Sequence, residues 1–168
     1  MTVQPTIEPA TRADLDAIAE LWVRLARSQR DHGSYVRAGA NRTAMRDTLA
    51  AHLHTGGLLV ARADDDLVGF ATFSIERGSL ELDATRGLLS NLYVEPDYRD
   101  RGIGAALLEV AEEKLADRGA EVVILEAMAD NEAARRFYRD RGYDTYRIGM
   151  ARSIDDSSEN DTHSKEDG

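Results

Sequence analysis

The sequence contains no cysteine in 168 residues, only two lysines (Lys114 and Lys165) and no long apolar run. Without cysteine, the chain has no disulfide bonds, no cysteine-zinc site and no cysteine nucleophile, and a reducing compartment is favoured. No stretch approaches the roughly 20 apolar residues that span a bilayer. The first twelve residues lack the basic start and apolar middle of a signal peptide. We therefore expect a cytoplasmic protein with no membrane partner.

Acidic residues outnumber basic ones by 31 to 21, which gives a net charge of -10 at pH 7. A basic face for nucleic acid or for an anionic membrane is therefore not expected. Residues 153–168 carry six acids against one lysine and almost no apolar side chain. We expect one domain over residues 1–152 and an acidic disordered tail over residues 153–168. The excess of aspartate and arginine fits adaptation to high salt and a GC-rich genome equally well.

The first half of the chain alternates helical and strand-like patterns. A T-x-x-D cap at Thr11 and Asp14 precedes apolar residues at three- and four-residue spacing, which predicts a helix ending near His32. A second, weaker helix should end at Gly56. The stretch "LLVARADDDLVGFATFSIE" predicts an antiparallel hairpin with its turn at residues 64–66. A further strand is expected over residues 88–94.

The second half predicts a strand-helix-strand crossover. An amphipathic helix from about residue 103 ends near Gly119, and "EVVILEAM" after it has the composition of a buried strand. The strands on either side of the helix should be parallel neighbours. A short helix from Asn131 to Gly142 and a last strand, "YDTYRIGM", complete the order β-α-α-β-β-β-α-β-α-β. This order predicts an α/β fold, a mixed sheet with helices on both faces.

Two glycines, Gly102 and Gly104, stand at the start of the amphipathic helix, with Arg99 and Arg101 just before them. Amides at a helix start are unpaired and carry partial positive charge, so an anion can bind to bare backbone there. A dinucleotide fingerprint is excluded because Leu107 stands in place of its third glycine, and no Gly-Lys-Ser/Thr tripeptide is present. The glycine pair alone is equally compatible with a tight turn.

The stretches "LYVEPDYRDRGIGAALL" and "ADNEAARRFYRDRGY" together closely resemble the acetyl-CoA-binding half of the GCN5-related N-acetyltransferases (the GNAT family). The family's R/Q-x-x-G-x-G/A signature is met by Arg99, Gly102 and Gly104. Its second block, N-x-A-x-x-x-F/L-Y-x-x-x-G-F/Y, begins at Asn131 and ends at Tyr143. The two blocks span roughly residues 88–150 at the spacing usual for the family.

The resemblance implies the acyl-CoA N-acyltransferase (GNAT) fold, with acetyl-CoA as co-substrate and no metal. In the family, a bulged strand binds the pantetheine arm through its backbone and the glycine turn binds the pyrophosphate. The implied cofactor-binding residues are Leu92, Tyr93, Val94, Arg99, Asp100, Arg101, Gly102, Ile103, Gly104, Ala105 and Asn131.

The resemblance also implies an acid and a base, with spacing that matches the ribosomal-protein alanine N-acetyltransferase branch. Tyr138 stands at the position of the proton-donating tyrosine. A phenol with a pKa near 10 beside a thiol near 8.5 is mismatched by only about 2 kcal/mol. Glu126 stands at the position of the base, and burial in its strand would make its carboxylate more basic. The structural alternatives are a packed helix aromatic for Tyr138, and for Glu126 a carboxylate that reaches water or pairs with Arg135.

One position departs from the family pattern. Many relatives have a glutamate where this sequence has Asn91, which puts a base on that strand in doubt. Glu95, Glu81 or an ordered water are the substitutes that the sequence offers. The four histidines lack metal-ligand spacing.

The sequence thus predicts an acetyl-CoA-dependent N-acetyltransferase that moves acetyl directly from the thioester to a primary amine. The acceptor is expected to be a small molecule or a protein N-terminus, and a protein lysine and a homodimer both stay open. Acceptor choice should depend on residues 31–42, on a strand at residues 76–83 and on the last strand near Tyr146. A non-catalytic acyl-CoA-binding regulator and a transferase of a longer acyl group are the alternatives.

Overall fold

The computed structural model describes residues 4–155, which divide into two compact units, one up to residue 132 and one from residue 133. The acidic tail predicted from residue 153 lies outside the described residues from 156 onward, and residues 153–155 are exposed. The first unit holds five strands and three long helices. The strands are β1 (Thr6–Pro9), β2 (Leu58–Ala63), β3 (Asp66–Ile75), β4 (Arg86–Val94) and β5 (Val122–Leu125), and the helices are α1 (Leu15–Arg30), α2 (Arg42–Thr55) and α3 (Ile103–Asp117).

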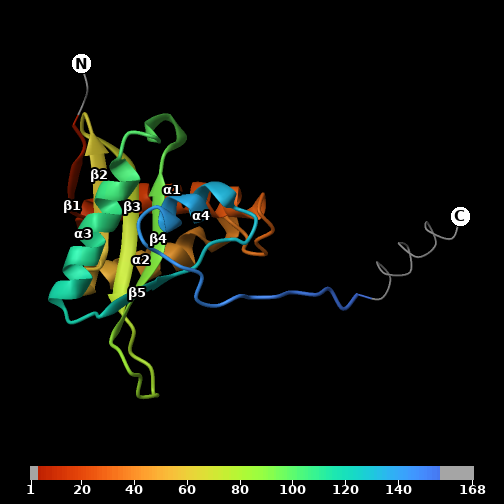
Figure 1. Ribbon diagram of the computed structural model, residues 1–168. Helices are drawn as coiled ribbons and strands as arrows, with labels where there is room; N and C mark the ends of the chain where they lie inside the picture. Colours follow the sequence, from red (N-terminus) through yellow and green to blue (C-terminus); the bar gives the residue numbers. More distant parts are fainter. Residues whose placement is uncertain (1–3, 156–168) are drawn as a thin grey trace, which may run out of the picture. The chain divides into compact units, whose positions relative to one another are not determined.

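The sheet follows chain order, β1-β2-β3-β4-β5. The first four strands pair antiparallel, whereas β4 and β5 pair parallel, as a crossover through α3 requires. Figure 1 shows α3 in front of this sheet and α1 and α2 behind it. The predicted α/β class, the mixed sheet and the crossover are therefore confirmed.

Side chains alternate between the two faces of the sheet, and each face has its own core. On the α1 side, Phe70 and Tyr93 are buried in one cluster with Ile18 and Trp22 of α1. On the α3 side, a β-carbon built on Gly69 would lie 3.3 Å from Leu107. This alternation is what a strand packed on both faces requires.

The hairpin between β2 and β3 turns as the three aspartates predict. Asp64 and Asp65 both have left-handed backbone, with φ of 50° and 67°. Two such residues form the two-residue turn whose twist matches antiparallel strands, and aspartate tolerates this conformation better than most residues.

Two predicted strands are wrong. Residues 143–150 form no strand in the described chain, and Tyr146, Ile148 and Met150 are exposed there. Their alternation is typical of a strand, but alternation does not supply a neighbour for pairing. Residues 76–85 form a loop between β3 and β4 rather than a strand, and Leu80 and Leu82 on it are exposed.

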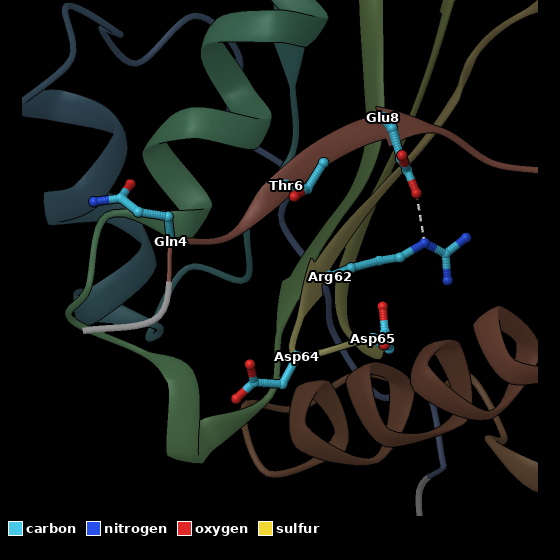
Figure 2. Close-up of a pocket in the computed structure, with 6 residues that line it drawn as sticks. All are labelled: Gln4, Thr6, Glu8, Arg62, Asp64 and Asp65. Carbon is cyan, nitrogen blue, oxygen red and sulfur yellow. Dashed lines mark hydrogen bonds and ion pairs between the residues drawn. The ribbon is translucent and has the colours of Figure 1, made fainter. Parts of the chain in front are cut away.

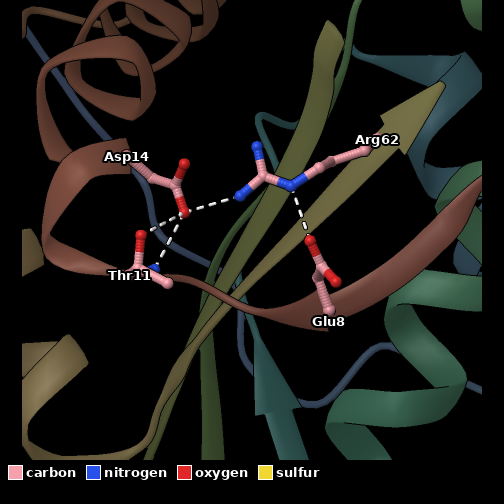
Figure 3. A network of polar contacts seen from close by, with 4 residues as sticks. All are labelled: Glu8, Thr11, Asp14 and Arg62. Atoms are coloured by element: carbon pink, nitrogen blue, oxygen red, sulfur yellow. Dashed lines mark hydrogen bonds and ion pairs between the residues drawn. The ribbon is translucent and has the colours of Figure 1, made fainter. Parts of the chain in front are cut away.

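The predicted T-x-x-D cap forms, and it extends into a network that joins three elements (Figure 3). The Asp14 carboxylate accepts hydrogen bonds from the Thr11 amide at 2.8 Å and the Thr11 hydroxyl at 3.2 Å. Arg62 of β2 donates to Asp14 at 2.7 Å and, through Nε, to Glu8 of β1 at 2.6 Å. The start of α1 is thereby tied to the β1 and β2 strands.

Burial alone would raise the pKa of Asp14, but the hydrogen bonds and charge of Arg62 and the hydrogen bonds of Thr11 outweigh it, so the pKa is lowered. A lowered folded-state pKa stabilises the fold above the unfolded value of about 3.9, and this contribution is lost as the pH falls through the folded-state value. We expect Asp14→Asn to lower the free energy of unfolding at pH 7 by about 1 to 3 kcal/mol. The difference from the unchanged protein should shrink below about pH 4, as measured by urea unfolding across pH 3 to 7.

Asp16→Asn is the matched control, since Asp16 pairs with Arg46 through a side chain that is 84% exposed. It should change stability little at any pH. A pH-independent loss in Asp14→Asn would contradict the charge-based explanation.

Candidate functional site

The strand β4 parts from β5 half-way along its length. The last parallel pair joins Leu89 to Leu125, and β4 then continues to Val94 against β3 alone. Ser90 is an extra residue at this point, because Thr72 and Phe73 of β3 face Asn91 and Leu89. Such a bulge bends a strand and ends its pairing on one side. In the described chain, the β4 edge over residues 91–94 therefore extends past β5, in the form that an added extended ligand can pair with.

Side chains on this stretch point alternately to the two faces. Tyr93 is 5% exposed and lies against Phe70 with ring centres 6.4 Å apart. Asn91, on the same face, donates its amide to the buried Thr72 hydroxyl at 2.9 Å. Leu92 and Val94 face the other side and are half-buried. The predicted Leu92, Tyr93 and Val94 thus present backbone at the open edge.

The glycine turn follows directly. A 3-10 turn (Pro96–Tyr98) leads to Asp100 and Gly102, which have φ of 62° and 83°, and α3 begins at Ile103. The first hydrogen bond of the helix runs from the Ala106 amide to the Gly102 carbonyl at 3.0 Å. The amides of Ile103, Gly104 and Ala105 precede this bond, so they face the helix start. A β-carbon on Gly102 would meet nothing within 4 Å, so its left-handed backbone, rather than crowding, favours glycine.

The two arginines flank this turn against aromatic rings. Arg99 donates Nε to the Val94 carbonyl at 2.9 Å, and its guanidinium carbon is 5.6 Å from the Tyr93 ring centre. The Arg101 guanidinium lies 5.4 Å from the Tyr98 ring. The residues predicted to bind cofactor from Leu92 to Ala105 therefore form one continuous segment, an open strand edge followed by a positively polarised helix start.

Glu126 does not have the buried environment expected from its sequence. The strand β5 ends at Leu125, so Glu126 comes just after it and is exposed. The strand itself is only half-buried, with Val122 42% exposed, because β5 is the edge of the described sheet. Asn131 is half-buried and directly precedes helix α4 (Glu132–Arg139), where a helix cap stands.

Tyr138 lies in the second unit, on α4. Its ring packs edge-on against Phe137 and Tyr143, with ring centres 5.1 and 5.7 Å away. Burial raises the pKa of Tyr138 to about 12. The phenol therefore stays protonated throughout the physiological pH range.

A second feature, on the β1-β2 side of the first unit, is a polar cavity of about 390 Å³. It is lined by Gln4, Thr6, Glu8, Arg62, Asp64 and Asp65 (Figure 2). The Arg62 guanidinium is already paired with Glu8 and Asp14. We therefore assign this cavity to the network that holds α1 on the sheet.

The described residues contain no group of three or more metal-binding side chains that could hold an ion. Within residues 4–155, no helix has the length and apolar character needed to cross a membrane.

The family model described as the Acetyltransferase (GNAT) family matches residues 15–143. This chain belongs to the GNAT family. An uncharacterized N-acetyltransferase of Archaeoglobus fulgidus is 31% identical over 132 residues, which cover 79% of this chain and 88% of that protein. The [ribosomal protein bS18]-alanine N-acetyltransferase of Escherichia coli K12 is 40% identical over 73 residues, 44% of this chain and 47% of its own.

A solved aminoglycoside N-acetyltransferase in complex with CoA has the same fold, with a TM-score of 0.73. It is 18% identical, and the match covers 92% of this chain and 97% of that one. Membership of the GNAT family makes this chain an acyltransferase, with acetyl-CoA-dependent N-acetylation as the general activity.

One contact of this GNAT protein, beside the glycine turn, could not be predicted from the sequence. Glu95, which follows β4, forms an ion pair with Arg24 of α1. The two residues lie 71 positions apart, and nothing in the local pattern of either one predicts their contact.

The high pKa of Tyr138 predicts a distinctive titration. Of the six tyrosines, Tyr138 should contribute almost no tyrosinate absorbance between pH 9 and 11, since its pKa is about 12. Tyr138→Phe should therefore leave the native absorbance change at 295 nm over that range nearly unaltered.

The same titration in concentrated denaturant is the control. There every tyrosine should titrate near pH 10, so the variant should show one tyrosine fewer. A loss of one tyrosine in the native titration as well would show that Tyr138 is not buried.

Proposed function

We propose that this GNAT protein transfers acetyl from acetyl-CoA directly to a primary amine, on a protein N-terminus or a small molecule. The observation that supports this most is the continuity of two backbone sites, the open β4 edge at residues 91–94 and the start of α3. An extended pantetheine arm can pair with the first, and its pyrophosphate then reaches the second. We propose the transferase domain as residues 1–152 and residues 153–168 as a tail.

The strand edge and the helix start together would hold the cofactor. Backbone groups of Leu92, Tyr93 and Val94 would pair with the pantetheine arm, and one amide would donate to the thioester oxygen as it becomes an oxyanion. The amides from Arg99 to Ala105 would bind the pyrophosphate, with the guanidinium groups of Arg99 and Arg101 as charged donors. Asp100 contributes its backbone alone, because a carboxylate repels phosphate. Asn131 would contact the pantetheine arm from the start of α4.

Direct transfer needs a neutral amine, a stabilised oxyanion and a protonated leaving sulfur. We propose that Glu126 accepts the proton of the acceptor amine, directly or through water. This exposed carboxylate can then pass the proton on to solvent. We propose that the Tyr138 hydroxyl contacts the leaving sulfur of CoA. With a pKa of about 12 for Tyr138, full proton transfer to a thiolate is unfavourable by about 5 kcal/mol. The phenol therefore serves chiefly as a hydrogen-bond donor to the developing thiolate, which takes its proton from solvent as CoA leaves.

The E. coli relative favours an N-terminal alanine as the acceptor, because it is named for that activity on a ribosomal protein. Its match covers less than half of either chain, so small amines and protein lysines stay in the proposal. A cytoplasmic location and a homodimer stay predictions from the sequence.

Incubation with acetyl-CoA and a panel of N-terminal peptides, polyamines and small amines, at low and multimolar salt, tests the activity. We expect CoA release that requires an acceptor. A thiol reagent reports CoA alone, because the chain has no cysteine. Tyr138→Phe and Glu126→Gln should each lower kcat by roughly 10²- to 10⁴-fold while the Kd for acetyl-CoA stays the same.

The alternatives give different outcomes. CoA binding with no release for any acceptor would support the regulator, and faster turnover of butyryl-CoA than acetyl-CoA would support a longer acyl group. Lack of CoA binding would rule out the proposed function.

Backbone binding at the glycine turn predicts a specific effect of Gly102→Ala. Forcing alanine into left-handed backbone costs about 1 kcal/mol of stability, and relief of this strain would turn the amides away from the pyrophosphate. We expect a lower melting temperature together with a CoA Kd raised roughly tenfold, as measured by calorimetry.

Two matched glycines separate these effects. Gly119, beyond the other end of α3, also has left-handed backbone (φ 96°) and open space around it, so Gly119→Ala should lose stability but bind CoA normally. Gly39→Ala, with open space and no left-handed φ, should change neither. Equal loss of CoA binding in Gly119→Ala would argue against a pyrophosphate site at Gly102.

A further inference from the structure

A chain of side-chain contacts runs from α1 to the end of β4. Arg24 of α1 pairs with one carboxylate oxygen of Glu95, and the Tyr93 hydroxyl donates to the other at 3.3 Å. The Glu95 side chain is 18% exposed and the Arg24 side chain is 55% exposed, so the carboxylate is shielded from water while its arginine reaches the surface. The backbone of Glu95 is held by a separate hydrogen bond, from its amide to the Val68 carbonyl of β3 at 2.8 Å.

The ring of Tyr93 also contacts Arg99, the first arginine of the glycine turn. The Arg99 guanidinium lies over the Tyr93 ring, and its Nε is tied to the Val94 carbonyl. The hydrogen bond to Val94 uses Nε and not the terminal nitrogens of the guanidinium, which are the donors suited to a phosphate. Tyr93 therefore has Glu95 at its hydroxyl and Arg99 over its ring.

A carboxylate beside Arg99 would compete with a cofactor phosphate for its guanidinium. Glu95 is four residues from Arg99 and shares Tyr93 with it, yet the ion pair of Glu95 is with Arg24. Without Arg24, this half-buried carboxylate would lack its cation, and Arg99 on the other side of Tyr93 would attract it. It would then occupy Arg99 and repel the pyrophosphate.

We propose that Arg24 is a positioning residue for cofactor binding, which holds the Glu95 carboxylate on the α1 side and so leaves the Arg99 guanidinium for the pyrophosphate. This inference rests on the proposed function, because it takes the glycine turn as the pyrophosphate site. It assigns a role in cofactor binding to a residue of the first helix, far in sequence from the two motifs. Arg24 itself contacts neither cofactor nor acceptor in this role.

The test compares Arg24→Gln with the unchanged protein for two ligands, CoA and pantetheine, which lacks the pyrophosphate. We expect the Kd of CoA to rise roughly three- to tenfold and that of pantetheine to stay the same. The KM for acetyl-CoA should rise with it, while kcat at saturation is unchanged. Arg24→Lys, which keeps the cation, should bind CoA nearly as well as the unchanged protein.

Two double variants identify the route of the effect. Arg24→Gln with Glu95→Gln removes the competing carboxylate and should restore most of the CoA affinity. Arg24→Gln should add little to Arg99→Gln, because both act through the same guanidinium. Arg46→Gln breaks an exposed ion pair between α1 and α2 and is the control that should leave both ligands unaffected.

Several results would overturn the inference. These are normal CoA binding by Arg24→Gln, an equal loss of pantetheine binding, or a double variant with Glu95→Gln that stays as weak as Arg24→Gln. Failure of the unchanged protein to bind CoA would instead overturn the proposed function, and the inference with it.

Discussion

The parting of β4 from β5 after Leu89 is the constraint on which the rest of the site depends. A backbone in the middle of a sheet is fully paired and cannot bind a ligand, whereas within the described residues the bulge at Ser90 leaves residues 91–94 paired on the β3 side only. The same four residues end just before the turn into α3. The open edge and the helix start are thus held in a fixed order by a strand that β3 and the α1 core keep in place.

The proposed recognition through backbone would also explain how an acidic chain binds a polyanion. The net charge is -10, but the amides at the start of α3 and two arginines beside it supply a local positive field. In the role proposed for Arg24, its ion pair keeps the Glu95 carboxylate away from that field. Charge placement at the turn therefore matters more than the total charge.

Much of the fold could be predicted from the sequence, because local patterns determine it. The T-x-x-D cap, the three aspartates of the hairpin and the strand-helix-strand order all depend on neighbours close in the chain. The glycine turn was predictable for the same reason, since Gly102 and the start of α3 are adjacent. The prediction of a strand at residues 143–150 was wrong because an alternating pattern needs a partner strand, which sequence spacing does not supply.

The environment of Glu126 was not predictable, since the apolar run before it is equally typical of a central strand and an edge strand. The Arg24–Glu95 pair joins residues 71 positions apart and depends on how α1 packs on the sheet. Both failures concern tertiary packing rather than local chemistry.

The open β4 edge has a consequence for handling the protein without its cofactor. An unpaired strand edge with apolar neighbours such as Leu92 and Val94 is a template on which another chain can add a strand, the first step of ordered aggregation. A bound ligand that pairs with this edge fills it and stabilises only the folded state, in proportion to its concentration over its Kd. For this fold, the cofactor would therefore act as a substitute for a missing strand, and shelf life would depend on the cofactor that accompanies the protein through purification.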